Sequence, residues 1–246
     1  FNGLLMNNAS LERERANLSR YFSPNVVDQL SQNDEPLKQV RSEHVAVMFI
    51  DIVGFTKMSE KLADKDVVRV VNSCFDAIGE VITAHDGYID KYIGDAIMAV
   101  WNAPNTVDNP EQAAVDAARD IIGLLDDIRK KAGQDTLDLR IALNAGPVLV
   151  GDIGGEHRRS FTVMGTTVNT ASRIESVAKE KKVRLAVSQS VADGLPDSYP
   201  VKEIWTGQLR GLSSDLSVFT LDQAEVYMEP EASSQDLNRP RLVKVP

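Results

Sequence analysis

The succession of apolar patterns between residues 44 and 145 constrains the fold of this chain more than any other feature. Short apolar or alternating runs predict strands, and apolar residues that recur every three or four positions predict helices. The chain has a strand, a helix, two strands, a helix and a strand, at residues 44–50, 64–87, 88–93, 96–101, 109–131 and 137–145. This β-α-β-β-α-β order predicts a ferredoxin-like α+β fold.

Local signals support several of these boundaries. Asp64 can cap the first helix, and Gly87 can end it. Gly94-Asp95 lies between two apolar runs and predicts a tight turn between strands. Asn109-Pro110 combines an N-cap with a first-turn proline and predicts the start of the second helix.

The rest of the chain extends this core. We expect a strand at 148–153 as the hairpin partner of 137–145, followed by a helix and three strands, at residues 167–179, 183–187, 199–206 and 215–221. Near the start, Leu4, Leu11 and Leu18 are seven residues apart, which suits either a short parallel coiled coil or an ordinary amphipathic helix. A short helix from Ser23 to Leu30 follows, and residues 31–42 have the polar character of a linker.

Charge and composition exclude some partners and sites. With 27 Lys+Arg against 36 Asp+Glu the net charge is −9, which argues against nucleic acid as a partner. Cys74 is the only cysteine, so neither an intramolecular disulfide nor a multi-cysteine zinc site can form. No apolar run reaches the roughly 18 residues of a membrane span. The chain begins with Phe1, and we interpret it as part of a longer protein.

Two aspartates occupy positions suited to metal binding. Asp51 directly follows the strand 44–50, and Asp95 lies in the expected turn between 88–93 and 96–101. Each alone is compatible with a turn or cap role. On neighbouring strands of one sheet, however, the two carboxylates could hold two divalent cations, and hard oxygen ligands favour Mg²⁺ or Mn²⁺ over zinc.

Two further clusters stand out by spacing. Lys91 lies two residues from both Ile89 and Ile93, so alternation places it on their face of the strand, where an unpaired ammonium is costly unless the strand is at an edge. Asn169 and Arg173 are four residues apart and share a helix face. That face is either simply solvated or a site where the arginine binds phosphate.

The sequence resembles the catalytic domain of class III adenylyl and guanylyl cyclases. The segments that carry the resemblance are FIDIVGFT, DKYIGDAIMAVW, LNAGPVLVGDIG and FTVMGTTVNTASRIE, at residues 49–56, 90–101, 143–154 and 161–175. Their order and separation fit the family over about residues 43–221. Thr162 is similar to the threonine of the bacterial-type branch, and the N-terminal helix resembles the signalling helix that links many bacterial cyclases to a sensor.

The resemblance implies a fold, a reaction and a set of site residues. The fold is the class III cyclase fold, a ferredoxin-like core with a C-terminal extension. Each active site would bind two Mg²⁺ or Mn²⁺ ions through Asp51, Asp95 and the backbone carbonyl of Ile52. Asn169 would orient the ribose, and Arg173 would stabilise charge on the α-phosphate. Phosphate contacts are implied for Gly54, Phe55, Thr56 and Arg210.

Lys91 and Thr162 match the pair that recognises the purine in the family. Adenine presents an acceptor at N1 and a donor at N6, which an ammonium and a hydroxyl can satisfy. Guanine would favour a carboxylate where Lys91 stands. The resemblance therefore favours an adenylate cyclase that converts ATP to cyclic AMP and pyrophosphate. The alternatives are a guanylate cyclase and a catalytically silent, cyclase-like regulatory module.

The family builds its active site between two chains, and this chain carries both halves. We therefore expect a homodimer with shared sites. The domains we expect are a signalling helix or coiled coil with linker at 1–42, the catalytic domain at 43–223 and a disordered tail at 224–246. An upstream sensor in the longer chain and a cytoplasmic catalytic domain are also expected, whether or not the parent protein is attached to a membrane.

Overall fold

The computed structural model describes residues 40–155, 159–209 and 215–221. The expectations for the heptad leucines, the helix at 23–30 and the tail at 224–246 concern residues outside these ranges. The strands are β1 Arg41–Ile52, β2 Tyr88–Ile93, β3 Ala96–Trp101, β4 Leu139–Gly154, β5 Arg159–Met164, β6 Leu185–Ser188, β7 Val201–Gly207 and β8 Leu216–Leu221. The helices are α3 Phe55–Ser59, α4 Asp64–Ala84, α5 Pro110–Gly123, α6 Leu125–Ala132, α7 Thr166–Lys181 and α8 Gln189–Asp193.

One sheet organises the structure. Its strand order is β2-β3-β1-β4-β6-β8-β7, and β5 pairs with the far part of β4. β1 lies between β3 and β4 and is antiparallel to both. The order β2-β3-β1-β4 is the one expected of a ferredoxin-like core, so the α+β prediction is confirmed.

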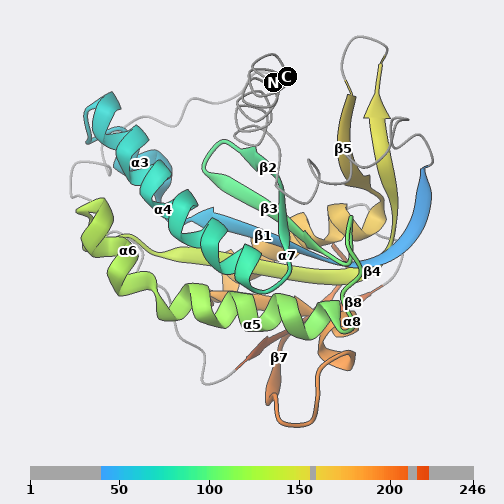
Figure 1. Ribbon diagram of the computed structural model, residues 1–246. Helices are drawn as coiled ribbons and strands as arrows, with labels where there is room; N and C mark the ends of the chain where they lie inside the picture. Colours follow the sequence, from blue (N-terminus) through green and yellow to red (C-terminus); the bar gives the residue numbers. More distant parts are fainter. Residues whose placement is uncertain (1–39, 156–158, 210–214, 222–246) are drawn as a thin grey trace, which may run out of the picture.

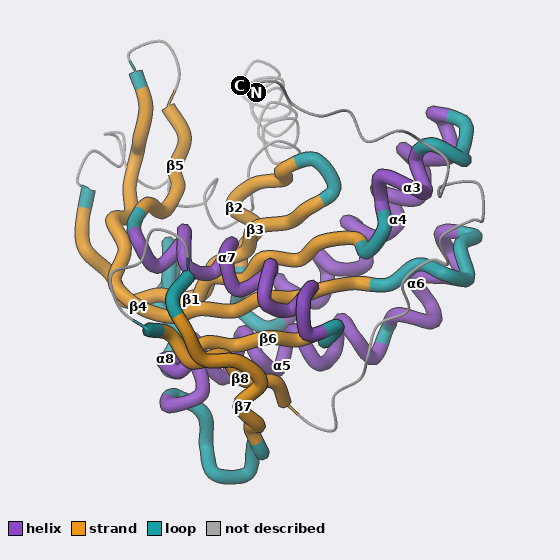
Figure 2. Tube along the Cα trace, turned by 180° about the vertical axis from the view of Figure 1, so that it is seen from behind, coloured by secondary structure: helices purple, strands orange, loops and turns teal. Residues whose placement is uncertain are grey.

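Helices cover both faces of the sheet. α4, α5 and α6 pack on one face and α7 on the other (Figure 1 and, from behind, Figure 2). Along β1, Met48 and Ile50 face the helices α4 and α5, whereas Val45 and Val47 belong to the cluster on the opposite face. Burial on both faces explains why this strand is apolar throughout and does not alternate with polar residues.

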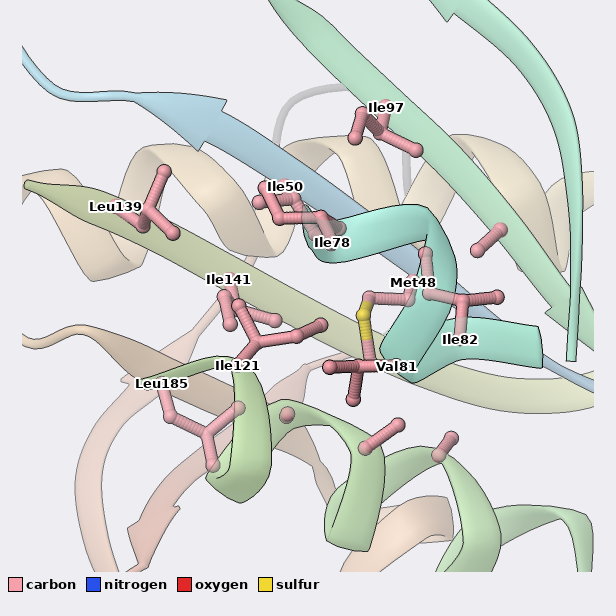
Figure 3. Close-up of a cluster of buried hydrophobic side chains, with 14 of the residues drawn as sticks. Met48, Ile50, Ile78, Val81, Ile82, Ile97, Ile121, Leu139, Ile141 and Leu185 are labelled. Atoms are coloured by element: carbon pink, nitrogen blue, oxygen red, sulfur yellow. The ribbon is translucent and has the colours of Figure 1, made fainter. Parts of the chain in front are cut away.

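The main core lies between the sheet and α4–α6. Figure 3 shows Met48 and Ile50 of β1 against Ile78 and Ile82 of α4, with Ile121 of α5 closing the cluster. All five side chains are essentially inaccessible to solvent. None of the helices within the described ranges is long and apolar enough to cross a membrane.

The expected hairpin within 137–153 is wrong. β4 continues as a single strand through Gly146 and Pro147, and its hairpin partner is β5. The reason is that β1 begins as early as Arg41 and pairs with β4 across this dipeptide as far as Val150. Gly146 has φ 156°, and a Cβ there would lie 2.9 Å from Oγ1 of Thr167, so the glycine serves close packing of α7 and not a turn.

Two helix boundaries also differ from expectation. The helix predicted from 109 to 131 is divided at Leu124 into α5 and α6. Asn109 does cap α5, because its side chain accepts a hydrogen bond from the Gln112 amide at 3.0 Å. Asp64 does not cap α4: the N-cap is Ala63, and Asp64 is the first helical residue.

Candidate active site

The first part of the site is a pocket at the end of β1. Asp51 pairs with Ala96, the first residue of β3, so Asp95 in the preceding turn lies beside it. Both aspartates line a pocket of about 410 Å³ together with residues 52–57, Arg140 and Lys179. The aspartates that the sequence singled out are thus brought together, as are the neighbouring Ile52, Gly54, Phe55 and Thr56.

The surroundings of Asp51 disfavour the ionised form of its carboxyl group. Its pKa is raised from 3.8 to about 6, mainly by burial, and the negative charges of Asp95 and Glu175 contribute in the same direction. Arg140 opposes this shift by donating from Nη2 to Oδ2 of Asp51 at 2.5 Å, while its Nε donates to Glu175 at 2.5 Å. The pocket therefore favours an additional positive charge next to Asp51.

A divalent cation fits this donor set. Asp51 and Asp95 supply carboxylate oxygens, and Ile52, whose backbone carbonyl is the third predicted ligand, lines the same pocket. Within the described ranges no three His, Cys, Asp or Glu side chains gather into a metal-holding group, so the protein itself offers few ligands here. Mg²⁺ suits such a site, because it commonly takes one or two carboxylates and completes its shell with water and phosphate oxygens.

Sequence reasoning missed the basic residues of this pocket. Arg140 lies in β4 between apolar neighbours and is 5% exposed, and Lys179 reaches the pocket from α7. The signal for Arg140 was present, because a charged residue inside an otherwise apolar strand needs a partner. Nothing in the sequence alone indicated that the partners would be Asp51 and Glu175.

Lys91 and Thr162 meet at a second place. The Lys91 ammonium donates to Oγ1 of Thr162 at 3.0 Å, joining β2 to β5 across 71 positions of sequence. Lys91 does not share the face of Ile89, contrary to the alternation argument. Ile89 packs with the core on the α4 side, and a bulge between Ile89 and Lys91 shifts the alternation.

Asn169 and Arg173 lie on α7, away from the aspartates. Glu175 and Lys179 define the side of α7 that faces the pocket of Asp51. At about 100° per residue, Arg173 is separated from Glu175 by about 160° and Asn169 by about 120° around the helix. Both therefore project from a different side of α7, and neither of them lines the pocket. Arg210 lies outside the described residues.

Comparisons with known proteins agree on one family. Residues 37–223 match the family described as the adenylate and guanylate cyclase catalytic domain. The chain is 30% identical over 180 residues to adenylate cyclase 1 of Rhizobium meliloti (strain 1021), covering 72% of this chain and 27% of that protein. The curated relatives are longer, and this chain spans 27–35% of their length.

Solved structures give the same result. A bacterial light-regulated adenylyl cyclase superposes with a TM-score of 0.79 at 25% identity, over 92% of this chain and 65% of that chain. The guanylyl cyclase Cya2 superposes with a TM-score of 0.69 at 28% identity, over 75% of this chain and 94% of that one. Adenylyl and guanylyl cyclases are thus both among the structures similar to this chain.

Proposed function

Because the chain belongs to the family of adenylate and guanylate cyclase catalytic domains, we propose that it converts ATP to 3′,5′-cyclic AMP and pyrophosphate. The observation that carries the choice of ATP is the contact between Lys91 and Thr162, at 3.0 Å. An ammonium that donates to N1 and a hydroxyl oxygen that accepts from the 6-amino group match the edge of adenine.

The reaction joins the ribose 3′-oxygen to the α-phosphorus. The bond from that phosphorus to the bridging oxygen breaks, pyrophosphate leaves, and the 3′-hydroxyl proton passes to solvent. Two Mg²⁺ or Mn²⁺ ions, bound by Asp51, Asp95 and the Ile52 carbonyl, would supply Lewis-acid activation of the hydroxyl and neutralise the leaving charge.

The protein's own groups position the substrate and stabilise charge. Arg140 and Lys179 carry positive charge into the pocket of Asp51, where the triphosphate would bind beside Gly54–Thr56. Asn169 would orient the ribose, and Arg173, with its fork of donors, would stabilise charge on the α-phosphate. A contact from Arg210 to phosphate is part of the same proposal.

The arrangement on α7 supports a homodimer with shared sites. In one chain, Asn169 and Arg173 project from a different side of α7 than Glu175 and Lys179, and they do not line the pocket of Asp51 and Asp95. This arrangement is unsuited to bringing all four residues of one chain to one nucleotide. A second copy, related by two-fold symmetry, could present its Asn169, Arg173 and Lys91 to that pocket, so that each dimer has two equivalent sites.

We also propose the place of this domain in a larger protein. The catalytic domain would span residues 43–223, preceded by the signalling helix and linker of 1–42 and followed by a disordered tail at 224–246. It would act as the cytoplasmic output domain of a chain with an upstream sensor. The curated relatives support this organisation, because the match covers only 27% and 34% of the length of two of them.

The test is product identification. The purified protein is incubated with ATP or GTP in Mn²⁺ or Mg²⁺, and the products are separated by chromatography. Cyclic AMP and pyrophosphate from ATP, with much less product from GTP, are expected. Preferential cyclic GMP would indicate the guanylate alternative, and no product at concentrations that enforce dimers would indicate a silent module.

A further inference from the structure

Asp90, the residue before Lys91, is buried in the middle of the purine-binding pair. Its side chain is 0% exposed. Oδ2 accepts a hydrogen bond from Oγ1 of Thr162 at 2.8 Å and lies 3.2 Å from the Lys91 ammonium. Oδ1 accepts from the Tyr88 hydroxyl at 3.1 Å. Both carboxylate oxygens are therefore engaged within the protein, and Asp90 is not exposed to contact a base directly.

A β-bulge creates this arrangement. Ile89 pairs with Ala99 and Lys91 pairs with Met98, so Asp90 is the extra residue of β2. In a regular strand, consecutive side chains point to opposite faces. The bulge instead lets Asp90 and Lys91 reach the same hydroxyl, that of Thr162.

The contacts of Thr162 determine what it can offer a ligand. A hydroxyl has one proton and two lone pairs. The proton is donated to Asp90, and one lone pair accepts from Lys91. One lone pair remains, so the hydroxyl can only accept a hydrogen bond from a bound base.

We propose that Asp90 is a specificity-determining positioning residue, which holds the Thr162 hydroxyl as an acceptor and so selects purines with an amino group at position 6. This inference rests on the proposed binding of the purine by Lys91 and Thr162. A purine with a carbonyl at position 6 would place an oxygen lone pair against the lone pair of Thr162, and both would lack a proton. The selectivity thus resides in a residue that does not touch the base.

Tyr88 supports the geometry of the carboxylate. Burial, and then the charge of Asp90, raise the pKa of the Tyr88 phenol well above its usual value. Its hydroxyl therefore stays protonated and keeps donating to Oδ1, which leaves Oδ2 for Thr162. The Tyr88 hydroxyl contacts Oδ1 of Asp90, whereas Thr162 contacts Oδ2. Removing the Tyr88 hydroxyl therefore leaves the acceptor of Thr162 in place and provides a matched control.

The test compares ATP with inosine 5′-triphosphate, which has a carbonyl in place of the 6-amino group. Asp90→Leu keeps a branched side chain of similar size but has no acceptor, so the hydroxyl of Thr162 becomes free to turn and donate. The ratio of kcat/KM for ATP to that for the inosine nucleotide should fall about tenfold relative to wild type, the effect of about one hydrogen bond. Inosine also differs at N1, which Lys91 would contact, and Asp90 lies 3.2 Å from that ammonium. Asp90→Leu in a Thr162→Ala background should therefore leave the ratio unchanged, because the proposed effect acts through the Thr162 hydroxyl.

Two variants separate this role from a structural one. In Asp90→Asn the amide oxygen can still accept from Thr162 while its NH₂ group donates to Tyr88, so the ratio should stay within about threefold of wild type. Tyr88→Phe should behave in the same way. A merely structural role would lower kcat/KM for both nucleotides in parallel and leave the ratio unchanged.

An unchanged ratio in Asp90→Leu would overturn the inference; if that variant does not fold, Asp90→Ala takes its place with the same criterion. The proposed function is judged separately, by wild-type turnover of ATP. If the wild type turns over no nucleotide, the same ratio is measured from the Kd values of ATP and the inosine nucleotide by calorimetry. The inference is then supported if Asp90→Leu loses the preference for binding ATP over the inosine nucleotide while Asp90→Asn and Tyr88→Phe keep it. The same preference in all variants contradicts it.

Discussion

At the scale of single residues, Asp51 combines a functional requirement with a cost in stability. Its pKa is raised to about 6, first by burial and then by Asp95 and Glu175. The ionised carboxylate needed for a cation is therefore the form that the fold disfavours. Arg140 offsets part of this cost, and a bound cation would offset more.

The stability of the cation-free protein should depend on the ionisation of Asp51. Because the folded-state pKa is raised from 3.8 to about 6, the protonated form stabilises the fold at low pH, and this contribution is lost as the pH rises through 6. Compared with Asp51→Asn, wild type should lose up to about 3 kcal/mol of unfolding free energy between pH 4 and pH 7.5. Urea unfolding in a chelator at several pH values measures this.

Loss of the Arg140 ion pair in Asp51→Asn adds an offset, but the prediction concerns the change with pH. Adding Mg²⁺ at pH 7.5 should restore stability to wild type more than to the variant. A difference between wild type and Asp51→Asn that stays constant from pH 4 to pH 7.5 would contradict the assignment.

Asp51→Ala tests the catalytic role of the same residue. Removal of a cation ligand should lower turnover at least about 10³-fold, while the dimer remains folded. Turnover is measured as cyclic nucleotide formed at saturating Mn²⁺, and dimerisation by light scattering. Robust activity in a folded Asp51→Ala dimer would show that the cations are held elsewhere.

The sequence predicted some contacts of the site and not others, according to how regular the local backbone is. Asp51 and Asp95 could be placed together from sequence, because a strand end and a hairpin turn have regular positions in this fold. Asp90 and Arg140 could not. The role of Asp90 depends on a bulge that a strict period of two does not reveal, and the partners of Arg140 come from β1 and α7.

At the scale of secondary-structure elements, Gly87 controls how α4 connects to β2. A Cβ at this position would lie 2.5 Å from Cε2 of Trp101, which is fully buried and donates from Nε1 to the His85 carbonyl at 2.8 Å. The glycine therefore allows the chain to leave α4 close against β3. Its small size is what the junction requires.

Gly87→Ala should destabilise the fold by about 2 kcal/mol, because the indole has no room to move. Gly123→Ala is the matched control: a Cβ there meets nothing within 4 Å, and alanine favours the helix, so a gain of up to about 1 kcal/mol is expected. Thermal unfolding of both variants measures the effects. Equal Tm values for the two would show that Trp101 accommodates the extra carbon.

The prediction of a turn at Gly146-Pro147 failed for a reason at this same scale. Glycine and proline are local turn signals, but the pairing of β1 with β4 extends on both sides of the dipeptide. The gain from a continued ladder and from close packing against Thr167 outweighed the local preference. The long helices and most of the other strands were predictable because their apolar periodicity matches their burial, whereas β5 and the short helices α3 and α8 were not predicted.

At the scale of the whole molecule, the ferredoxin-like order could be predicted, since it follows from the succession of local patterns. The division of the site was expected only from the family resemblance; local patterns do not reveal it, because it depends on which side of α7 each residue occupies. Glu175 and Lys179 lie on the side of α7 next to the pocket of Asp51, and Asn169 and Arg173 lie on a different side and do not line it. The central claim is therefore that two copies of this chain complete each other's sites.

Mixing two inactive variants tests this claim most directly. Asp51→Ala and Arg173→Ala chains are unfolded together, refolded at equal concentration and assayed for cyclic AMP from ATP. Each heterodimer would have one intact site and one doubly damaged site, so random mixing predicts about a quarter of wild-type activity. Each variant refolded alone should remain inactive. Activity in the refolded mixture no higher than in either variant alone, with heterodimers present, would contradict the shared site.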